Sequence, residues 1–224
     1  MGNKQNVLFI AKGWLGEKCG LPEINAPSIQ INTTERKHVN YAAATKTNRM
    51  TQVRTDIDAG GAAGKMELGT TGMALVLATI ALGFSGVSTA TIAGSVMTFA
   101  GFPRSDASAD ASGIAREARV RTSANADVIT AMTVGLNSTV APAWAVSTVV
   151  PTGAKRTNGA NIYNATVGGT TAASGGPTGT GASIADNTVT WAWYCVANAE
   201  VQMDNIDLAI TQVVNVNSVT ITHG

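Results

Sequence analysis

Few residues of this 224-residue chain are of a type that performs chemistry, and their spacing does not favour catalysis. The two histidines, His38 and His223, lie far apart in sequence, and neither belongs to an HExxH zinc motif. Ser85 follows Gly83 at the spacing of a nucleophile elbow, but Val87 stands where that motif needs its second glycine. The sequence therefore predicts a protein that is not an enzyme and has no catalytic residue.

Acidic residues and cysteines give no strong metal or redox pattern. Asp106 and Asp110 lie with Arg104 in a segment of small residues, where a calcium or acid–base role is conceivable and a solvated loop is the simpler interpretation. Cys19 and Cys195 belong to no CxxC or Cys/His cluster. Two free thiols are expected, with a single disulfide as the alternative. We expect no cofactor and no bound metal.

A glycine-rich run from 168 to 181 could in principle cradle a phosphate. A P-loop needs a lysine directly after its last glycine, and none is present. Gly179 and Gly181 match the start of a dinucleotide fingerprint, but Ile184 occupies the third glycine position and a strand pattern follows. The run is therefore interpreted as a series of turns.

Aromatic residues follow this run. Trp191 and Trp193 alternate with smaller residues and should share one face of a strand, and Tyr163 is expected on a partner strand beside them. These three rings either form the core of a small module or contact a partner or glycan by stacking. The sequence does not decide between these two interpretations.

The elements that would position these residues are mostly strands. Charged residues are 13% of the chain and the net charge is +1, so we expect no nucleic-acid partner. Thr, Ala, Gly, Asn, Ser and Val dominate, as is typical of strands and turns. A surface with so few charges suits a protein whose faces are covered by neighbouring chains.

One helix is expected at about 48–59. Its apolar residues recur at helical spacing and comprise Met50, Val53 and Ile57. Thr45 or Thr47 could cap its start, and Gly60 could end it in a left-handed conformation.

Strand patterns follow the helix. The stretch 68–103 has no charge and the length of a membrane span, but glycines interrupt it every few residues, so strands and no membrane partner are expected. Within it, 73–82 is apolar on both faces, as in a central strand. Residues 101–113 form a polar loop, and Ala118, Val120 and Thr122 should face inward from a half-buried strand.

We expect a mainly β protein, a β-sandwich or jelly-roll-like fold in four parts. They are an extended N-terminal arm at 1–43, a first part of the sandwich at 44–138, a small inserted β module at 139–197 and closing strands at 198–224. In the closing strands Ile206, Leu208 and Ile210 should share one face. The arm has too few apolar residues to bury itself, so Trp14, Ile29 and Ile31 are candidate contacts with other chains.

Two groups of motifs resemble structural proteins of tailed bacteriophages. The stretch "TNRMTQVRTDIDAGGAAGKMELG", the "SADASG" loop with its following strands, and "IDLAITQVVNVNSVTITHG" resemble, in that order, a virion family of the capsid decoration or cement type. The residues from Asn158 to Trp191 resemble a module common in phage structural proteins, with an Asn-Gly pair, a "GPTGTG" run and "DNTVTW". Asn187 departs from the glycine usual at that position.

The resemblance implies a function in assembly. It implies a virion protein, made in the bacterial cytoplasm, that binds the major capsid protein and copies of itself as a homo-oligomer such as a trimer. A tail, neck or fibre component is one alternative. A carbohydrate-binding adhesin that uses Trp191 and Trp193 is another.

Overall fold

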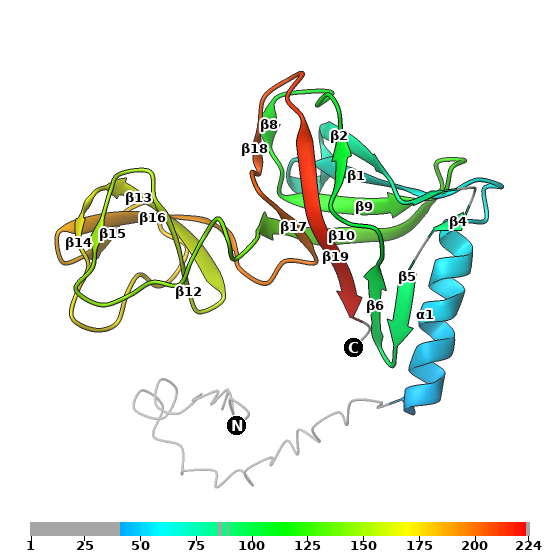
Figure 1. The fold of residues 1–224 in the computed structure, drawn as a ribbon, viewed down its shortest axis with the longest axis horizontal. Coiled ribbons are helices and arrows are strands. Elements are labelled where there is room, and N and C mark those ends of the chain that lie inside the picture. Colours follow the sequence, from blue (N-terminus) through cyan, green and yellow to red (C-terminus); the bar gives the residue numbers. More distant parts are fainter. Residues whose placement is uncertain (1–40, 85–86, 89, 223–224) are drawn as a thin grey trace, which may run out of the picture. The chain divides into compact units, whose positions relative to one another are not determined.

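The computed structural model describes residues 41–84, 87–88 and 90–222 (Figure 1). The expected arm at 1–43 therefore lies almost wholly outside the described residues, as do Trp14, Ile29 and Ile31. The described chain is mainly β, with 46% strand and 10% helix, and its largest sheet curls into a half-barrel. The expected mainly β, sandwich-like fold class is confirmed.

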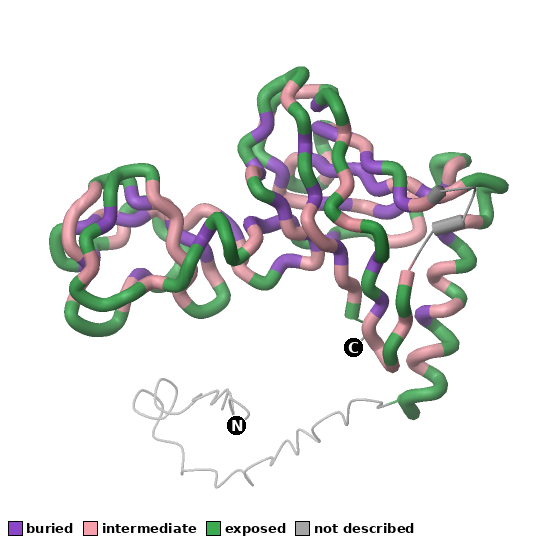
Figure 2. The backbone as a smooth tube through the Cα atoms, viewed as in Figure 1, coloured by how far each residue is buried: buried purple, intermediate pink, exposed green. Residues whose placement is uncertain are grey.

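Nine strands form the main sheet, and all neighbours are antiparallel except β10 and β17. The order along it is β2 (Val76–Ala81), β1 (Lys65–Gly69), β9 (Glu117–Arg121), β10 (Asp127–Leu136), β17 (Val201–Met203), β19 (Val214–Thr222), β6 (Val96–Phe99) and β5 (Ala90–Ala93), with β7 (Arg104–Asp106) also paired to β19. Buried residues alternate with more exposed ones along several of these strands (Figure 2).

The alternation in β9 places its small and apolar side chains inside. Ala118, Val120 and Thr122 are buried, as expected, while Arg119 and Arg121 point to the opposite face. In β1 Met66 and Leu68 are fully buried in the same core, while Glu67 is buried on the opposite face. Each large apolar side chain buried in this way contributes about 1.5–3 kcal/mol, so the inward face of the main sheet supplies the principal core.

Helix α1 (Ala43–Ile57) begins and ends earlier than its pattern predicted, and it packs on the same core. Met50 and Ile57 are buried and Val53 packs against the core, so the helical face is confirmed. The expected cap is wrong. No side chain caps the N-terminus at Ala42, and the Thr47 hydroxyl instead donates to the carbonyl of Ala43, one turn back.

Glycines after α1 have different functions from those expected. Gly61, with φ +79°, adopts the left-handed conformation that was expected of Gly60. Gly60 is needed for space, because a Cβ there would lie 2.2 Å from Ser123 Oγ. The chain after the helix therefore passes directly against the turn between β9 and β10.

β2 lies at the edge of the main sheet, so its expected central position is wrong. Its backbone is nevertheless hydrogen-bonded on both edges, because the segment 104–110 bonds the edge that faces away from β1. The Thr79 amide donates to Asp106 Oδ2 at 3.0 Å, and the Asp110 amide donates to the Leu77 carbonyl at 2.8 Å. The expected polar loop at 101–113 is also corrected, because it contains β7 and β8 (Gly113–Ile114), which pairs with β18 (Asp207–Leu208).

The opposite edge of the main sheet is β5, and α1 lies beside it (Figure 1). The Thr47 hydroxyl is 3.4 Å from the carbonyl of Gly94, and Arg54 Nη1 is 3.5 Å from that of Ala90. Side chains from the helix thus bond a carbonyl of β5 and one in the turn after it, which blunts an edge that could pair with another chain.

Residues between β10 and β17 form a separate small sheet, which we call the inserted module. Its four strands are β12 (Lys155–Asn158), β13 (Asn161–Val167), β16 (Val189–Val196) and β15 (Ile184–Asp186), with the short pair β11 (Val149–Val150) and β14 (Gly169–Thr170) beside them. Because β10 and β17 are neighbours in the main sheet, the chain leaves that sheet and returns beside its point of departure.

The charge-free stretch 68–103 forms short elements in its described part. They include η1 (Thr71–Met73), β3 (Gly83–Phe84) and β4 (Val87–Ser88), along with β2, β5 and β6. Among the described residues, no helix has the length and apolar character needed to cross a bilayer.

Candidate functional site

The inserted module is organised around one buried carboxylate. Asp186 Oδ2 accepts hydrogen bonds from the indole nitrogens of Trp144 at 2.8 Å and Trp191 at 2.9 Å. Asp186 Oδ1 accepts a third bond from the Ala172 amide at 2.9 Å. Both oxygens are thus occupied by donors from three separate segments, as a buried carboxylate requires. This arrangement fixes the module and leaves Asp186 no free oxygen facing solvent with which to bind a substrate.

The three aromatic residues singled out by the sequence meet in this module, as expected. β13 pairs with β16 so that Tyr163 lies opposite Trp193 and Ala165 opposite Trp191. Trp191 is 0% exposed and Tyr163 is also buried, whereas Trp193 is partly exposed. With both faces covered, the rings of Trp191 and Tyr163 present no surface on which a sugar could stack.

The glycine-rich run lies over these rings and bonds them through its carbonyls. Tyr163 Oη donates to the Gly179 carbonyl at 3.0 Å, and the Trp193 amide donates to that of Gly181 at 2.9 Å. Asn158 Nδ2 donates to the carbonyls of Gly175 at 3.3 Å and Pro177 at 3.0 Å. A phosphate cradle uses amide hydrogens, so these inward carbonyls agree with the interpretation as turns.

Asn187 lies in the tight turn between β15 and β16. Its φ is +55°, in the left-handed region that asparagine tolerates better than most residues. Its Nδ2 donates to the Thr170 carbonyl at 3.1 Å. Asparagine therefore permits this tight turn and adds a bond that glycine cannot make.

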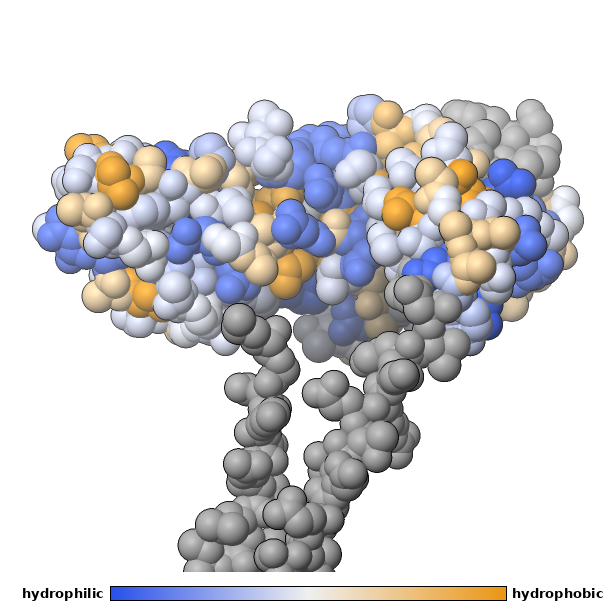
Figure 3. Space-filling view, turned by 90° about the horizontal axis from the view of Figure 1, so that it is seen from below, coloured by the Kyte–Doolittle hydropathy of each residue, from blue (hydrophilic) through white to orange (hydrophobic). Residues whose placement is uncertain are grey.

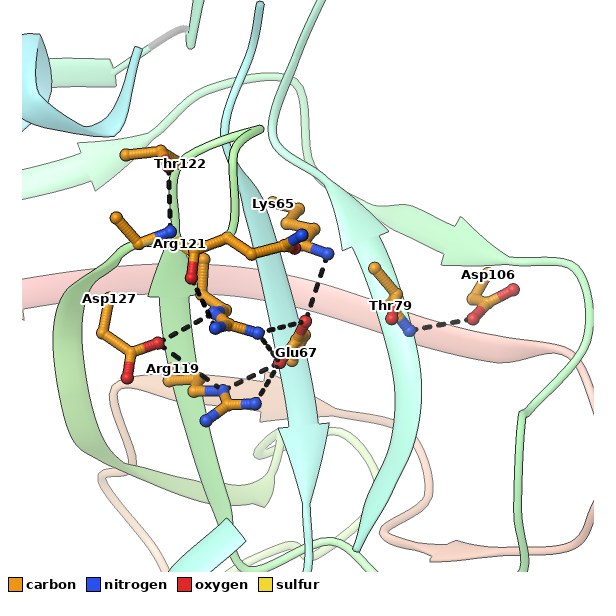
Figure 4. A network of polar contacts seen from close by, with 10 residues as sticks. Lys65, Glu67, Thr79, Asp106, Arg119, Arg121, Thr122 and Asp127 are labelled. Carbon is orange, nitrogen blue, oxygen red and sulfur yellow. Dashed lines mark hydrogen bonds and ion pairs between the residues drawn. The ribbon is translucent and has the colours of Figure 1, made fainter. Parts of the chain in front are cut away.

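The outward face of β1 and β9 carries a network of ion pairs that sequence reasoning missed (Figure 4). Glu67 is buried beneath its partners and contacts Arg119 Nη2 at 2.7 Å, Lys65 Nζ at 3.2 Å and Arg121 Nη1 at 3.4 Å. Asp127 contacts Arg121 Nε at 2.8 Å. The alternation of Arg119 and Arg121 was visible in the sequence, but their position opposite Glu67 depends on the β1–β9 register.

This environment shifts the ionisation of Glu67. Burial raises the pKa of the carboxyl, but hydrogen bonds from Arg119 and Lys65 and the charges of Arg119 and Arg121 outweigh it, so the pKa is lowered below 4.5. Glu67 is therefore a carboxylate at neutral pH, fully engaged in ion pairs. The network is suited to holding strands together rather than to proton transfer.

The remaining chemical candidates are in structural positions. Asp106 accepts from the amides of Thr79 and Ser108 instead of lying in a solvated loop, and Arg104 Nη1 donates to the Ala81 carbonyl at 2.9 Å. Within the described part of the chain, no three His, Cys, Asp or Glu side chains are grouped as metal ligands. Cys195 is a buried free thiol whose pKa is raised by burial, and Cys19 lies outside the described residues.

Four large apolar side chains are exposed at one end of the main sheet, which we call the apolar end. They come from three segments and have exposed fractions of 46% for Leu75, 38% for Ile114, 57% for Ile210 and 54% for Val213. The expectation that Ile210 shares a buried face with Ile206 and Leu208 is wrong. The chain turns after β18, where Thr211 has φ +68°, and the turn carries Ile210 outward.

Large apolar side chains are also exposed on the inserted module, with exposed fractions of 53% for Val146, 75% for Val149 and 53% for Val167. In Figure 3 the module is mostly pale, and its orange areas are small and separate. Compared with family models, curated proteins and solved structures, the chain matches none. Its function must therefore be inferred from the features described above.

Proposed function

We propose that this chain is a structural protein of a tailed-bacteriophage virion, in particular a capsid decoration or cement protein. Its partners would be the major capsid protein and further copies of itself, in a homo-oligomer such as a trimer. The observation that carries the proposal is the apolar end, where four large apolar side chains from three segments are exposed, because exposed apolar surface is typical of sites that bind other proteins. The order of the phage-like motifs supports the same function.

The turn that carries Ile210 is held rigidly, which favours binding. The amide of Ile210 donates to Ser112 Oγ at 2.8 Å, and that of Thr211 donates to the Ala109 carbonyl at 3.0 Å. The Ala109 amide in turn donates to the Gln212 carbonyl at 2.7 Å. A side chain already fixed in its binding position loses little conformational entropy on association, so this end is prepared for contact with a partner.

The distribution of charge supports a function in contact rather than catalysis. Between 139 and 197 the charged residues are Lys155, Arg156 and the buried Asp186. The module therefore offers a largely uncharged surface of Ser, Thr, Gly and Asn, which can be covered without the cost of desolvating ions. Many such weak contacts, repeated over a lattice, give strong attachment.

The number of copies in purified particles tests this proposal. Quantitative mass spectrometry of virions that encode the chain should find it in the hundreds of copies expected of a shell protein. A dozen copies or fewer would indicate a tail, neck or fibre component, and absence from the particle would reject a virion protein altogether. For the adhesin alternative Trp193, which is partly exposed, remains as a stacking surface, because Trp191 and Tyr163 are buried.

A binding experiment tests the apolar end itself. Particles lacking the chain should bind the purified wild-type protein, and replacing both Ile210 and Val213 by Ser should weaken binding at least about tenfold, since each lost apolar contact costs on the order of 1 kcal/mol. Val149→Ser tests the second contact surface proposed here, because Val149 is 75% exposed on the inserted module. Wild-type binding by the Ile210 and Val213 double variant would rule out the apolar end as the binding surface.

A further inference from the structure

Arg116 extends from the main sheet to the inserted module. Its backbone is anchored between strands, since its amide donates to the Gly69 carbonyl at 2.9 Å and its carbonyl accepts from the Val134 amide at 3.3 Å. Its guanidinium reaches β16, where Nη1 donates to the carbonyl of Tyr194 and Cζ lies 5.0 Å from the ring centroid of Trp193. One side chain thus makes a charged hydrogen bond and a cation–π contact to the same strand.

Beside this contact the module and the main sheet share a small apolar junction. Cys195 and Ile162 of the module are buried with the residues of the main core. Gly135 of β10 allows the close approach, because a Cβ there would lie 2.4 Å from the Val196 carbonyl oxygen and 3.0 Å from Ala199 Cβ. The Cys195 side chain is 1% exposed, so solvent reaches the thiol only when the junction opens.

We propose that Arg116 is a latch that holds the inserted module against the main sheet, and that its release opens the junction and exposes the thiol of Cys195. The inference does not depend on the function proposed above. Two covalent connections, after β10 and before β17, join the module to the sheet and would persist after release. With Arg116 bound to β16 the module is fixed against the main sheet, and after release it can move about the two connections. The accessibility of the Cys195 thiol distinguishes the two states.

The reactivity of Cys195 tests the latch directly. In a Cys19→Ser background Cys195 is the single thiol of the chain, and its modification by N-ethylmaleimide at pH 8 can be followed by mass spectrometry. Arg116→Ala should accelerate modification on the order of 10- to 100-fold, as expected for loss of a charged hydrogen bond and a cation–π contact. Arg116→Lys, which keeps the charge but not the planar fork, should give a smaller acceleration.

Arg156→Ala is the matched control. Arg156 lies on the module and its Nη1 donates to the carbonyl of its neighbour Lys155 at 2.9 Å. This variant should modify Cys195 at the wild-type rate. Equal rates in wild type and Arg116→Ala, or equal acceleration by Arg156→Ala, would overturn the proposal.

Dependence on urea separates opening of the junction from unfolding. Local opening exposes little surface, so the modification rate of Arg116→Ala should rise only weakly with low urea, whereas global unfolding gives a steep rise. A steep dependence that matches global unfolding would also overturn the proposal. If Arg116→Ala does not fold, Arg116→Lys decides the outcome by the same criterion, together with a red shift of the tryptophan fluorescence, to which Trp193 contributes.

Discussion

The core of the main sheet consists of 27 described side chains, including Ala141, Ile162 and Cys195 from the inserted module, whereas the core particular to the module consists of Val150, Tyr163, Ala165, Val189 and Trp191. The main sheet places its ion pairs on its outward face, around Glu67. The module has its carboxylate inside, bonded by two indoles and an amide. One region is therefore stabilised chiefly by buried area and the other chiefly by specific hydrogen bonds.

The difference explains why the two regions have such different sequences. A large core accepts many apolar residues at a given position, provided that the volume is kept. A small module cannot bury enough area to be stable and must use particular donors and acceptors at fixed places. Asn158, Tyr163, Asp186 and Trp191 each have such a place, which is why the module contains many polar and aromatic side chains with specific hydrogen-bond partners.

Loss of the Asp186 carboxylate should give the largest difference in stability between the inserted module and the main sheet. Asp186→Ala leaves the indoles of Trp144 and Trp191 and the Ala172 amide without a partner, and we expect a loss of about 3–5 kcal/mol. Hydrogen exchange should show the module losing protection while β1 and β9 keep theirs. Asp110→Ala, at an exposed position, should change stability by less than about 0.5 kcal/mol. Simultaneous loss of protection in both regions would show that they are not stabilised separately.

Two adjacent glycines of the glycine-rich run test how tightly the inserted module is packed compared with the main sheet. Gly175 and Gly176 have φ of +92° and +87°, so alanine is strained at either position. Only at Gly176 would the Cβ also meet atoms, 2.8 Å from Asn158 Nδ2 and 3.0 Å from Trp144 Cδ2. We expect a cost of about 1 kcal/mol for Gly175→Ala and about 2–4 kcal/mol for Gly176→Ala. Urea unfolding followed by tryptophan fluorescence measures both losses of stability. Equal losses would mean that the side chains beside Gly176 are loosely packed.

The ion pairs of the main sheet should have the smallest effect and a distinct pH dependence. Glu67→Gln should cost about 1–2 kcal/mol at pH 7, because the lowered pKa of Glu67 reflects stabilisation of its charged form. That stabilisation is present above the unfolded-state pKa and is lost as the pH falls through the lower folded-state pKa. The difference between wild type and variant in urea unfolding should therefore shrink toward zero as the pH is lowered from 4.5 through the folded-state pKa.

Asp127→Asn is the control for this prediction, since the Asp127 side chain is more exposed than that of Glu67. Exposed ion pairs contribute about 0–1 kcal/mol, so this variant should be close to wild type. A difference between wild type and Glu67→Gln that stays constant down to pH 2 would contradict a charge-based contribution of Glu67.

The sequence by itself determined the features that depend on local periodicity. Alternation in β9 gave the buried face of Ala118 and Val120, and helical spacing gave that of Met50 and Ile57. The glycine-rich run predicted turns because it lacks the residues of a phosphate-binding loop, and alternation brought Tyr163, Trp191 and Trp193 together. Each of these features is decided within a few residues, where backbone geometry and side-chain direction suffice.

Only the tertiary structure decided which distant segments meet. β2 resembles a central strand in sequence, but the segment 104–110, and not a second neighbouring strand, bonds the edge that faces away from β1. The partners of Glu67, the donors to Asp186 and the reach of Arg116 all join residues far apart along the chain. Such contacts depend on strand order and register, which are fixed by packing of the whole core and leave no local periodicity in the sequence.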